Sequence, residues 1–430
     1  MYKLIYKIGV KLRNPTLVKK YKFLKETENW SLDKLNKYQF EKTKLFLQFA
    51  YEYSDYYKRV FDEVGFNPTI MKSLDDIRLI PVINKEILIN YNKEIHTNYK
   101  FKKLRLSETS GTSGQVLKFF RNEEWDSAHR ASIYRGYSWY GIKPWDKNGY
   151  FWGYNIASNL IIKTKFFDFF QNRFRLFSYE LKAVNNFIEK LKKAKYIHGY
   201  SSMIYEVAKV INTNPNFSFY KKGNIKMIKG TSEKIFDSYK DEVYKAFGIN
   251  IINEYGSAET GIIAYECPEG RNMHITMENL IVENIDNEIV VTNLLSKSFP
   301  IIRYKLGDYI ELEKSNFKCS CGKQHPVIKS VMGRVGKKVY GKSTIYPSLT
   351  FYYVFKNIAL GKGLNLNYQI IQEEKGVVNV KIEQNYPELK SLIISEFKKY
   401  FKNDLDIFIY FGVKLHSKKG KLKDFVSNIN

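Results

Sequence analysis

A strand–helix–strand pattern in the middle of the chain constrains the fold more strongly than any other feature. Residues 225–229 and 249–252 are short apolar runs typical of buried strands. Between them, apolar residues recur at helical spacing, and Gly248 stands where a helix C-terminus favours glycine. The apolar set comprises Ile235, Phe236, Tyr239, Val243 and Phe247. Strands joined by a crossover helix are parallel, so the sequence predicts an α/β fold.

A polar cluster follows each of these two strands. The first cluster consists of Gly230, Thr231, Ser232 and Glu233. The second occupies residues 254–259 and includes Tyr255, Gly256, Ser257 and Glu259. Open α/β sheets bind their ligands at the carboxyl ends of parallel strands. The two clusters therefore predict a ligand site at one edge of the sheet.

The rest of the chain divides into three segments. We expect a basic amphipathic segment at residues 1–30, a large domain with mixed sheets and flanking helices at 31–333, and a small, mobile α+β domain at 334–430. Within the large domain, apolar periodicity predicts one helix over residues 31–60. A strand is expected at residues 288–292.

The small domain carries its own strand and helix signals. Residues 366–370 and 377–382 alternate apolar and polar side chains, which predicts a hairpin across the four residues 373–376. A helix from about Pro387, a strand near residues 407–411 and a polar tail are expected to follow.

The first 25 residues hold eight Lys and Arg side chains and no acid before Glu26. Apolar residues at helical spacing lie between these charges, and Asn14 and Pro15 should end the helix; they are Met1, Leu4, Ile5, Ile8 and Leu12. Two interpretations remain open. The helix lies on an anionic membrane surface, or it packs on the body with its lysines in water.

Composition excludes several classes of protein. The chain has a formal net charge of +26, but its lysines are spread along the sequence without an Arg cluster or a nucleic-acid module, so we expect no nucleic-acid partner. Only three cysteines occur, which argues against a disulfide framework. There is no signal-peptide pattern and no run of 18 apolar residues. A cytoplasmic protein is expected, either free or peripheral to the inner face of the membrane.

A glycine- and hydroxyl-rich hexamer is suited to binding phosphate; it consists of Thr109, Ser110, Gly111, Thr112, Ser113 and Gly114. Glycines let the backbone approach closely, successive N–H groups form an anion-binding nest, and the hydroxyls donate hydrogen bonds without adding charge. Lys118 stands four residues beyond the last glycine and supplies a nearby cation. The hexamer is not a Walker A motif, because the spacing of its glycines differs.

All three cysteines lie in two turns that also contain histidine, residues 267–274 and 319–325. Three thiolates and one imidazole complete a closed tetrahedral Zn²⁺ site, which is structural because no position stays open for water. The ligands we expect are Cys267, His274, Cys319 and Cys321, with His325 as the alternative to His274.

Six segments in order resemble the adenylate-forming superfamily, and most closely its phenylacetate-CoA ligase and CapK-like branch. The hexamer resembles the superfamily's phosphate-binding motif, residues 230–233 its adenine-binding segment, and residues 255–259 its Tyr-Gly-x-x-Glu motif. Residues 303–308 resemble the Tyr-Arg-x-Gly-Asp motif, Gly333 and Arg334 the hinge, and residues 419–423 the segment of the catalytic lysine. The likeness covers nearly the whole chain.

The resemblance implies a role for each motif. Glu259 would hold Mg²⁺, Asp308 the ribose hydroxyls of ATP, and Lys421 the charge between a carboxylate and the α-phosphate. Thr112 would act on the phosphates with the remainder of the hexamer. The sequence departs from the superfamily at Gly336, which replaces the hinge aspartate, and Lys423 competes with Lys421 as the catalytic lysine.

The implied activity is an ATP-dependent ligase that forms an acyl-adenylate and passes the acyl group to an amine or to coenzyme A. An amide ligase of cell-surface polysaccharide assembly, acting on an acidic sugar or a small carboxylic acid, is the favoured interpretation. An aryl- or acyl-CoA ligase is the first alternative. A non-catalytic, zinc-stabilised protein that binds an anionic surface is the second.

Overall fold

The computed structural model describes residues 1–109, 116–151, 158–176, 181–214, 224–232, 235, 237–333, 338–362, 364, 366, 368–413, 415, 417–418, 421–422, 425–427 and 429. The chain divides into two compact units. The first comprises Met1–Glu108, Lys118–Tyr154 and Ile162–Gly333. The second comprises Arg334–Asn430 with the short segments Thr109–Leu117 and Asn155–Ile161.

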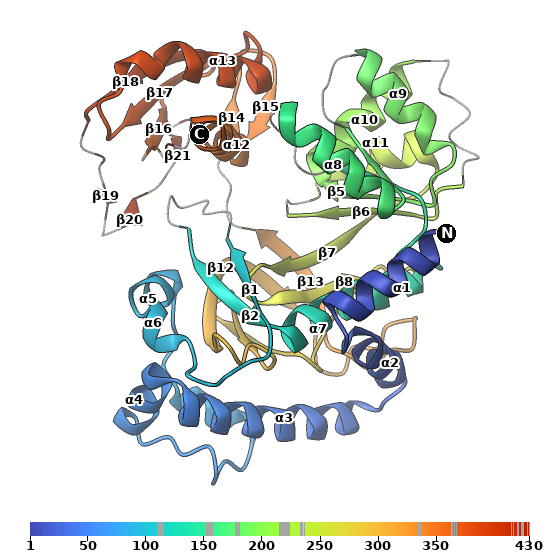
Figure 1. Ribbon diagram of the computed structural model, residues 1–430, viewed down its shortest axis with the longest axis vertical. Helices are drawn as coiled ribbons and strands as arrows, with labels where there is room; N and C mark the ends of the chain where they lie inside the picture. The colour runs from blue at the N-terminus through green and yellow to red at the C-terminus, as the bar shows by residue number, and fades with distance from the viewer. Residues whose placement is uncertain are drawn as a thin grey trace. The chain divides into compact units, whose positions relative to one another are not determined.

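A mixed sheet forms the centre of the first unit (Figure 1). Its described strands stand in the order β10-β11-β12-β13-β9-β8-β7-β6-β5-β3-β4. The parallel half contains β3 (Asn148–Phe151), β4 (Arg173–Arg175), β5 (Tyr196–Tyr200), β6 (Met227–Thr231) and β7 (Ile251–Ser257). The antiparallel half contains β8 (Gly261–Glu266), β9 (Met273–Ile275), β10 (Leu280–Ile285), β11 (Glu288–Asn293), β12 (Ile301–Leu312) and β13 (Val327–Gly333). The predicted α/β class with mixed sheets is confirmed.

The strand–helix–strand unit forms as predicted, with shifted bounds. Strands β6 and β7 pair in parallel, and α11 (Asp237–Phe247) connects them. Gly248 ends the helix with a φ of +71°, in the left-handed region that glycine enters most easily. Strand β7 continues to Ser257, so Tyr255 and Gly256 lie inside the strand and not beyond its end.

The helix predicted over residues 31–60 is two helices. Helix α3 (Leu32–Tyr53) ends at Ser54, which has extended backbone angles, and α4 (Asp55–Glu63) starts after it. The Ser54 hydroxyl accepts a hydrogen bond from the Tyr57 amide, as an N-cap does. Apolar periodicity continues across this break because both helices bury one face on the same body.

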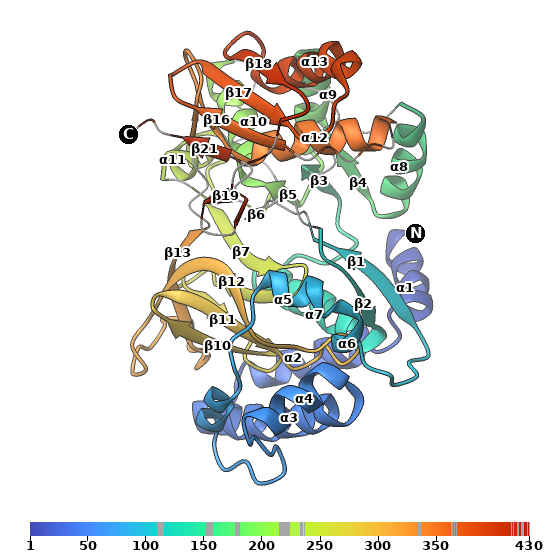
Figure 2. The same cartoon turned by 90° about the vertical axis from the view of Figure 1, so that its left-hand side faces the viewer.

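The remaining helices surround the sheet (Figure 2). They are α1 (Tyr2–Arg13), α2 (Leu17–Thr27), a 3₁₀ helix (Leu74–Leu79), α5 (Lys85–Asn90), α6 (Asn92–Ile95), α7 (Glu123–Trp139), α8 (Ser158–Phe170), α9 (Leu181–Leu191) and α10 (Ser201–Thr213). Helix α7 packs on β8, and an apolar cluster joins Tyr137 of this helix to Tyr196, Met227 and Ile252 of the sheet. No helix in the described residues is long and apolar enough to cross a membrane.

A buried carboxylate joins three distant parts of the first unit. Glu278, in the turn between β9 and β10, accepts a 2.6 Å hydrogen bond from Arg135 of α7. The same oxygen lies 2.8 Å from His325 Nε2 and 2.5 Å from the Thr27 hydroxyl at the end of α2. All four residues are buried. A buried charge pair in this environment requires both partners.

The second unit is a small α+β structure. Its main sheet has the order β18-β17-β16-β21, formed by β16 (Tyr368–Gln372), β17 (Val377–Ile382), β18 (Asp406–Tyr410) and β21 (Phe425–Ser427). The predicted hairpin is β16 with β17, and the core between sheet and helices α12 (Leu349–Lys362) and α13 (Lys390–Phe401) includes Phe351, Phe397 and Phe401. The C-terminal tail, which we expected to be polar, also contributes β21, which pairs in parallel with β16.

The ion pair predicts a large cost for removing one partner. We expect Glu278→Gln to lower the free energy of unfolding of the first unit by about 3–5 kcal/mol, because the buried Arg135 charge loses its partner. As a control, Glu311→Gln breaks a 2.6 Å pair with Lys329 in which both side chains are 52% exposed, and should cost far less than Glu278→Gln because water screens the pair. Urea unfolding measures both values.

The same residue predicts an acid limit to stability. Burial alone would raise the pKa of Glu278, but Arg135 and His325 lower it well below its ordinary value of 4.5. A carboxylate with a depressed folded pKa contributes stability above its unfolded pKa and loses it as pH falls through the folded pKa. The difference between wild type and Glu278→Gln should therefore stay constant down to pH 4.5 and shrink below it. A difference that is constant into strong acid would contradict this account.

Candidate active site and metal centre

The glycine- and hydroxyl-rich hexamer begins at the end of a hairpin strand. Strands β1 (Leu104–Glu108) and β2 (Lys118–Asn122) pair antiparallel, with Glu108 opposite Lys118. The Thr109 amide donates to the Leu117 carbonyl at 3.0 Å, and the Leu117 amide donates to the Thr109 hydroxyl at 3.1 Å. Thr109 thus closes the hairpin, and Lys118 is exposed in the second strand. The remainder of the hexamer, Ser110, Gly111, Thr112, Ser113 and Gly114, lies outside the described residues.

The first polar cluster lies at the carboxyl end of β6. A side chain at Gly230 would meet the Ser201 hydroxyl at 2.5 Å, so the close approach of β6 to the start of α10 requires glycine. Thr231 is the last residue of the strand, and Ser232 follows with a φ of +66°. A left-handed serine turns the chain sharply at the strand end. Glu233 lies outside the described residues.

A hydrogen bond joins the second cluster to the Asp308 motif. The Tyr255 hydroxyl donates to Asp308 Oδ2 at 2.8 Å. In the sheet order, β7 and β12 are separated by three strands, so this bond connects parts of the site that main-chain pairing leaves apart. Gly256 allows β8 to approach, because a side chain there would collide with the Gly261 carbonyl. The Ser257 hydroxyl lies 3.0 Å from the Thr260 hydroxyl, so its contact is within the same turn.

Glu259 is a buried carboxylate in the turn between β7 and β8, and it is 4% exposed. The Tyr304 hydroxyl donates to its Oε1 at 3.3 Å, and Asn293 Nδ2 donates to its backbone carbonyl at 3.2 Å. Arg121 of β2 donates to the carbonyl of the preceding Ala258. Burial lowers the pKa of Arg121, against the opposing effect of nearby acids that include Glu259. The carboxylate is the hard oxygen donor that Mg²⁺ takes from proteins, with phosphate oxygens supplying further ligands.

One of the predicted motifs also has a structural role. Arg303, which begins the Asp308 motif, has a φ of +47° and donates to both carboxylate oxygens of Glu283, at 3.0 and 2.9 Å. It therefore anchors β12 to β10. Arg334 lies outside the described residues, as does Lys423. Lys421 forms a two-residue strand, β20 (Lys421–Leu422), which pairs with β19 (Ser417–Lys418) in the second unit.

Four side chains from the two cysteine turns converge in the first unit. The ligand atoms of Cys267, His274, Cys319 and Cys321 all lie within 4.8 Å of one another. Cys267 Sγ is 3.6 Å from Cys319 Sγ, and Cys321 Sγ is 3.1 Å from His274 Nε2. Three sulfur atoms and one imidazole nitrogen in a set this compact suit a single Zn²⁺ in a closed site.

Neighbouring groups orient this cluster. The backbone near Gly270 passes so close to Cys319 Sγ that a side chain at this position would collide with the sulfur. Asn272 Nδ2 donates to Cys319 Sγ at 3.2 Å. His274 Nδ1 lies 3.1 Å from the His325 backbone carbonyl, which leaves Nε2 for a metal. Burial lowers the pKa of His274 to about 4, so this imidazole is neutral near pH 7, as a metal ligand must be.

The geometry separates the two candidate histidines. The His325 side chain is directed to Glu278 through Nε2, and it is not among the clustered ligands. Its contribution to the cluster is the backbone carbonyl that faces His274 Nδ1. Of the two alternatives that the sequence left open, the structure therefore brings His274 to the three cysteines.

Three residues of the site were missed by sequence reasoning. Tyr304 and Arg121 hold the Glu259 turn, and Asn272 faces Cys319. Tyr304 lies inside the segment 303–308, so its position in that motif and in the alternation of β12 could have indicated a role in the site. Arg121 and Asn272 carry no such signal, because their partners are 137 and 47 residues away in the chain.

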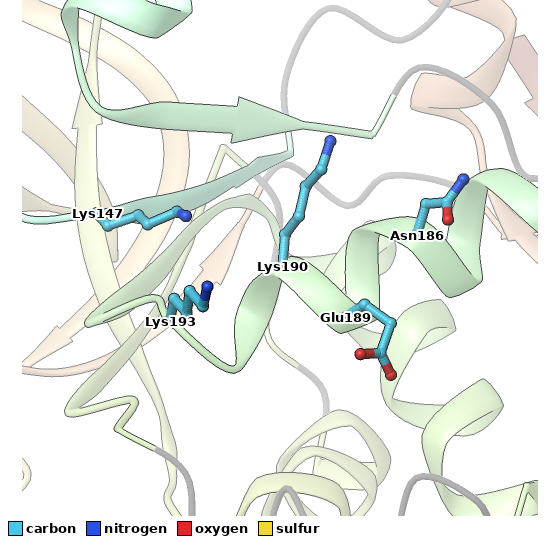
Figure 3. Close-up of a pocket in the computed structure, with 5 residues that line it drawn as sticks. All are labelled: Lys147, Asn186, Glu189, Lys190 and Lys193. Carbon is cyan, nitrogen blue, oxygen red and sulfur yellow. The ribbon is translucent and has the colours of Figure 1, made fainter.

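A surface pocket of about 490 Å³ lies elsewhere in the first unit (Figure 3). It is open to solvent and is lined by Lys147, Asn186, Glu189, Lys190 and Lys193. None of the predicted site residues lines it. Three of the lining residues are lysines, and the one acid, Glu189, is already paired with Lys192 at 2.6 Å. The pocket is therefore basic, but none of its lysines belongs to the predicted motifs.

Comparison with known proteins gives relatives at low identity. No family model matches the chain. The chain is 24% identical over 282 residues to protein CapK of Staphylococcus aureus, a match that covers 60% of this chain and 59% of that protein. It is 21% identical over 354 residues to phenylacetate-coenzyme A ligase of Thermus thermophilus, covering 75% of this chain and 76% of that protein.

Solved structures resemble the chain over nearly its whole length. A 2-hydroxyisobutyryl-CoA ligase in complex with 2-HIB-AMP and CoA superimposes with a TM-score of 0.64 at 16% identity, covering 93% of this chain and 91% of that one. The same ligase in the postadenylation state gives 0.60, covering 94% and 91%. At this identity the likeness establishes the fold.

The cluster predicts a defined metal content. We expect one zinc per chain after dialysis, loss of zinc in Cys319→Ser and in His274→Gln, and retention in His325→Gln. The last variant is the matched control, since it keeps the backbone carbonyl that orients His274. Mass spectrometry of the metal content measures all four proteins. Zinc retained by His274→Gln and lost by His325→Gln would reverse the assignment.

Proposed function

We propose that the chain belongs to the adenylate-forming superfamily, in its phenylacetate-CoA ligase and CapK-like branch, and that it is an AMP-forming, carboxylate-activating ligase. In the first step, a carboxylate oxygen of the substrate attacks the α-phosphorus of ATP. The bond from that phosphorus to the bridging oxygen breaks, and pyrophosphate leaves. In the second step, an acceptor attacks the acyl carbon, and AMP leaves as the new acyl bond forms.

The observation that carries the proposal is the convergence of two motifs on one hydrogen bond. Tyr255 and Asp308 are 53 residues apart, and they meet at 2.8 Å. The hydroxyl of Tyr255 fixes one oxygen of Asp308, so this tyrosine is a positioning residue. A carboxylate in a fixed orientation suits recognition of the two adjacent hydroxyls of a ribose.

Charge neutralisation is the main requirement of the first step, because two anions must approach each other. Glu259 would hold Mg²⁺, and the ion, when bound, supplies positive charge to the phosphate oxygens. The backbone amides and hydroxyls of the hexamer, Thr112 among them, would bind the phosphates. Lys421 would stabilise the charge that develops between the carboxylate and the α-phosphate. Gly230, Thr231 and Ser232, with Glu233, would border the adenine.

The zinc is proposed to be structural. Cys267 and His274 lie between the Glu259 turn and β10, and the other two cysteines precede β13. An ion at this place would tie together the chain segments that carry Glu259 and Asp308. Since all four positions of the ion would be filled by protein, we assign it no part in the chemistry.

The acceptor distinguishes two candidate activities. We propose an amine acceptor and an amide product, with an acidic sugar or small carboxylic acid as substrate, in cell-surface polysaccharide biosynthesis; this follows from the resemblance to the CapK-like branch. The second candidate is a thioester of coenzyme A. Two similarities favour this candidate: the sequence similarity to phenylacetate-coenzyme A ligase and the structural similarity to the 2-hydroxyisobutyryl-CoA ligase in complex with CoA. Mass spectrometry of the product with each acceptor separates the two.

The N-terminal segment suggests where the enzyme works. Helix α1 has no fully buried residue, and its described lysines are exposed. We propose that residues 1–25 make a peripheral contact with the inner face of a membrane. The proposed ligase activity does not use these residues.

Lys421→Ala provides the sharpest test of the mechanism. We expect it to slow acyl-adenylate formation by about 10²- to 10³-fold, because a positive charge at the reacting centre is lost. The melting temperature should not change, since alanine keeps the backbone of β20. Pyrophosphate release in the absence of acceptor measures the first step alone.

Two lysines serve as matched controls. Lys418→Ala removes a charge from the paired strand β19, opposite Lys421, and should leave the rate unchanged. Lys423→Ala tests the competing assignment. A loss of rate in Lys423→Ala with a normal rate in Lys421→Ala would transfer the role to Lys423, and a non-catalytic protein would be indifferent to all three.

A further inference from the structure

Helix α8 has its polar and apolar faces reversed. Within residues 162–170, Asp168 is the one buried side chain, and the large apolar residues are exposed. Ile162 is 76% exposed, Phe166 60% and Phe169 53%; Phe167 and Phe170 are exposed as well. An amphipathic helix on a globular protein normally turns its apolar stripe toward the core. Here that stripe faces solvent.

Ion pairs hold the helix in this orientation. Asp168 accepts a hydrogen bond from Arg173 Nε at 2.7 Å and from Arg175 Nε at 2.7 Å. Both arginines belong to β4, the edge strand of the parallel half of the sheet. At about 100° per residue, Phe166 and Phe170 lie on the side of the helix opposite Asp168. The outward aromatic face is therefore fixed by the inward carboxylate.

Helix α1 presents a second exposed apolar stripe. Met1, Leu4, Ile8 and Leu12 recur at helical spacing, and each is more than half exposed. The other side of the helix holds it to the body: Tyr6 contacts the rings of Tyr134 and Trp145, at 5.8 and 5.4 Å between centroids. The stripe itself stays exposed to solvent.

The two stripes adjoin. The rings of Tyr2 and Phe169 meet edge to face with centroids 6.0 Å apart, and both views draw the start of α1 beside α8 (Figure 1, Figure 2). We call this area the α1–α8 surface; it consists of Met1, Leu4, Ile8, Leu12, Ile162, Phe166, Phe167, Phe169 and Phe170. Exposed apolar patches of this kind mark interaction sites.

Basic residues accompany the apolar ones. Lys3, Lys7 and Lys11 form a row beside the α1 stripe, and Lys163 and Lys165 are exposed on α8. The only acid in either helix is Asp168, which is buried against its arginines. A partner of this surface must therefore combine an apolar interior with negative charge at its boundary.

We propose that the α1–α8 surface docks on a bilayer of anionic lipids, with the phenylalanines of α8 inserted at the level of the headgroups. The apolar side chains would leave water, and the lysines would meet the lipid phosphates. A second copy of the chain is a poorer partner, because two such surfaces would place like charges face to face. The inference rests on the membrane contact proposed for residues 1–25 and adds α8 as the inserting element.

Vesicle flotation tests the proposal with the full-length protein. Wild type should float with vesicles of phosphatidylglycerol and phosphatidylcholine, bind far less to phosphatidylcholine alone, and lose binding in high salt. Phe166→Gln with Phe170→Gln should weaken binding to the mixed vesicles by at least about tenfold. The matched control, Ile70→Gln with Tyr244→Gln, removes apolar residues that are 70% and 55% exposed elsewhere in the first unit and should bind like wild type.

Further variants distinguish the role of α8 from that of α1. Leu4→Gln with Ile8→Gln should also weaken binding. If this variant fails to bind while the α8 variant binds normally, the contact of residues 1–25 stands and our assignment of α8 is overturned. If both variants bind normally, the contact of residues 1–25 and the assignment of α8 are both overturned. Should the α8 variant misfold, Lys163→Glu with Lys165→Glu keeps the apolar face and must still reduce binding.

Two more measurements distinguish membrane docking from dimerisation and from the ligase activity. If light scattering shows a dimer in wild type that the α8 variant converts to a monomer, the surface is an interface between copies and the proposal is overturned. Acyl-adenylate formation without vesicles should be the same in wild type and the α8 variant. Its failure in both would reject the ligase activity while leaving the membrane result intact.

Discussion

The first unit depends on the buried hydrogen bonds and ion pair of the Glu278 carboxylate. One of its oxygens receives Arg135 from α7, His325 from the second cysteine turn and Thr27 from α2. These partners are 143, 47 and 251 residues away from Glu278 in the chain. A buried acid with this many donors fixes the relative positions of the segments that bring them.

The cysteine–histidine cluster is linked to this carboxylate. His325 binds Glu278 with its ring and faces His274 Nδ1 with its backbone carbonyl, so a single residue joins the ion pair to the cysteine cluster. The cluster in turn lies between the strands that lead to Glu259 and Asp308. The buried ion pair and the cysteine–histidine cluster are therefore linked, and the chemistry proposed for those two acids depends on the segments that this linkage holds.

Local sequence patterns predicted the parts of the fold that depend on neighbours in the chain. The parallel β6–α11–β7 unit and the β16–β17 hairpin follow from periodicity and from Gly248 or short turns. The expected choice of His274 over His325 agrees with the cluster that the structure forms. The break at Ser54, whose hydroxyl also donates to the Glu94 and Ile95 carbonyls, and the pairing of β21 depend on distant residues. The orientation of α8 depends on nearby residues instead: Arg173 and Arg175 are five and seven residues beyond Asp168, and only their pairing with it shows which face of the helix turns inward.

Pyrophosphate exchange tests the central claim, that the chain activates carboxylates with ATP. Purified wild-type protein with Mg²⁺ is incubated with ATP, labelled pyrophosphate and each member of a panel of small carboxylic acids and acidic sugars. We expect label to enter ATP only when a particular acid is present, without any acceptor. If no acid promotes exchange and the protein binds no ATP, the assignment as an adenylate-forming ligase is wrong.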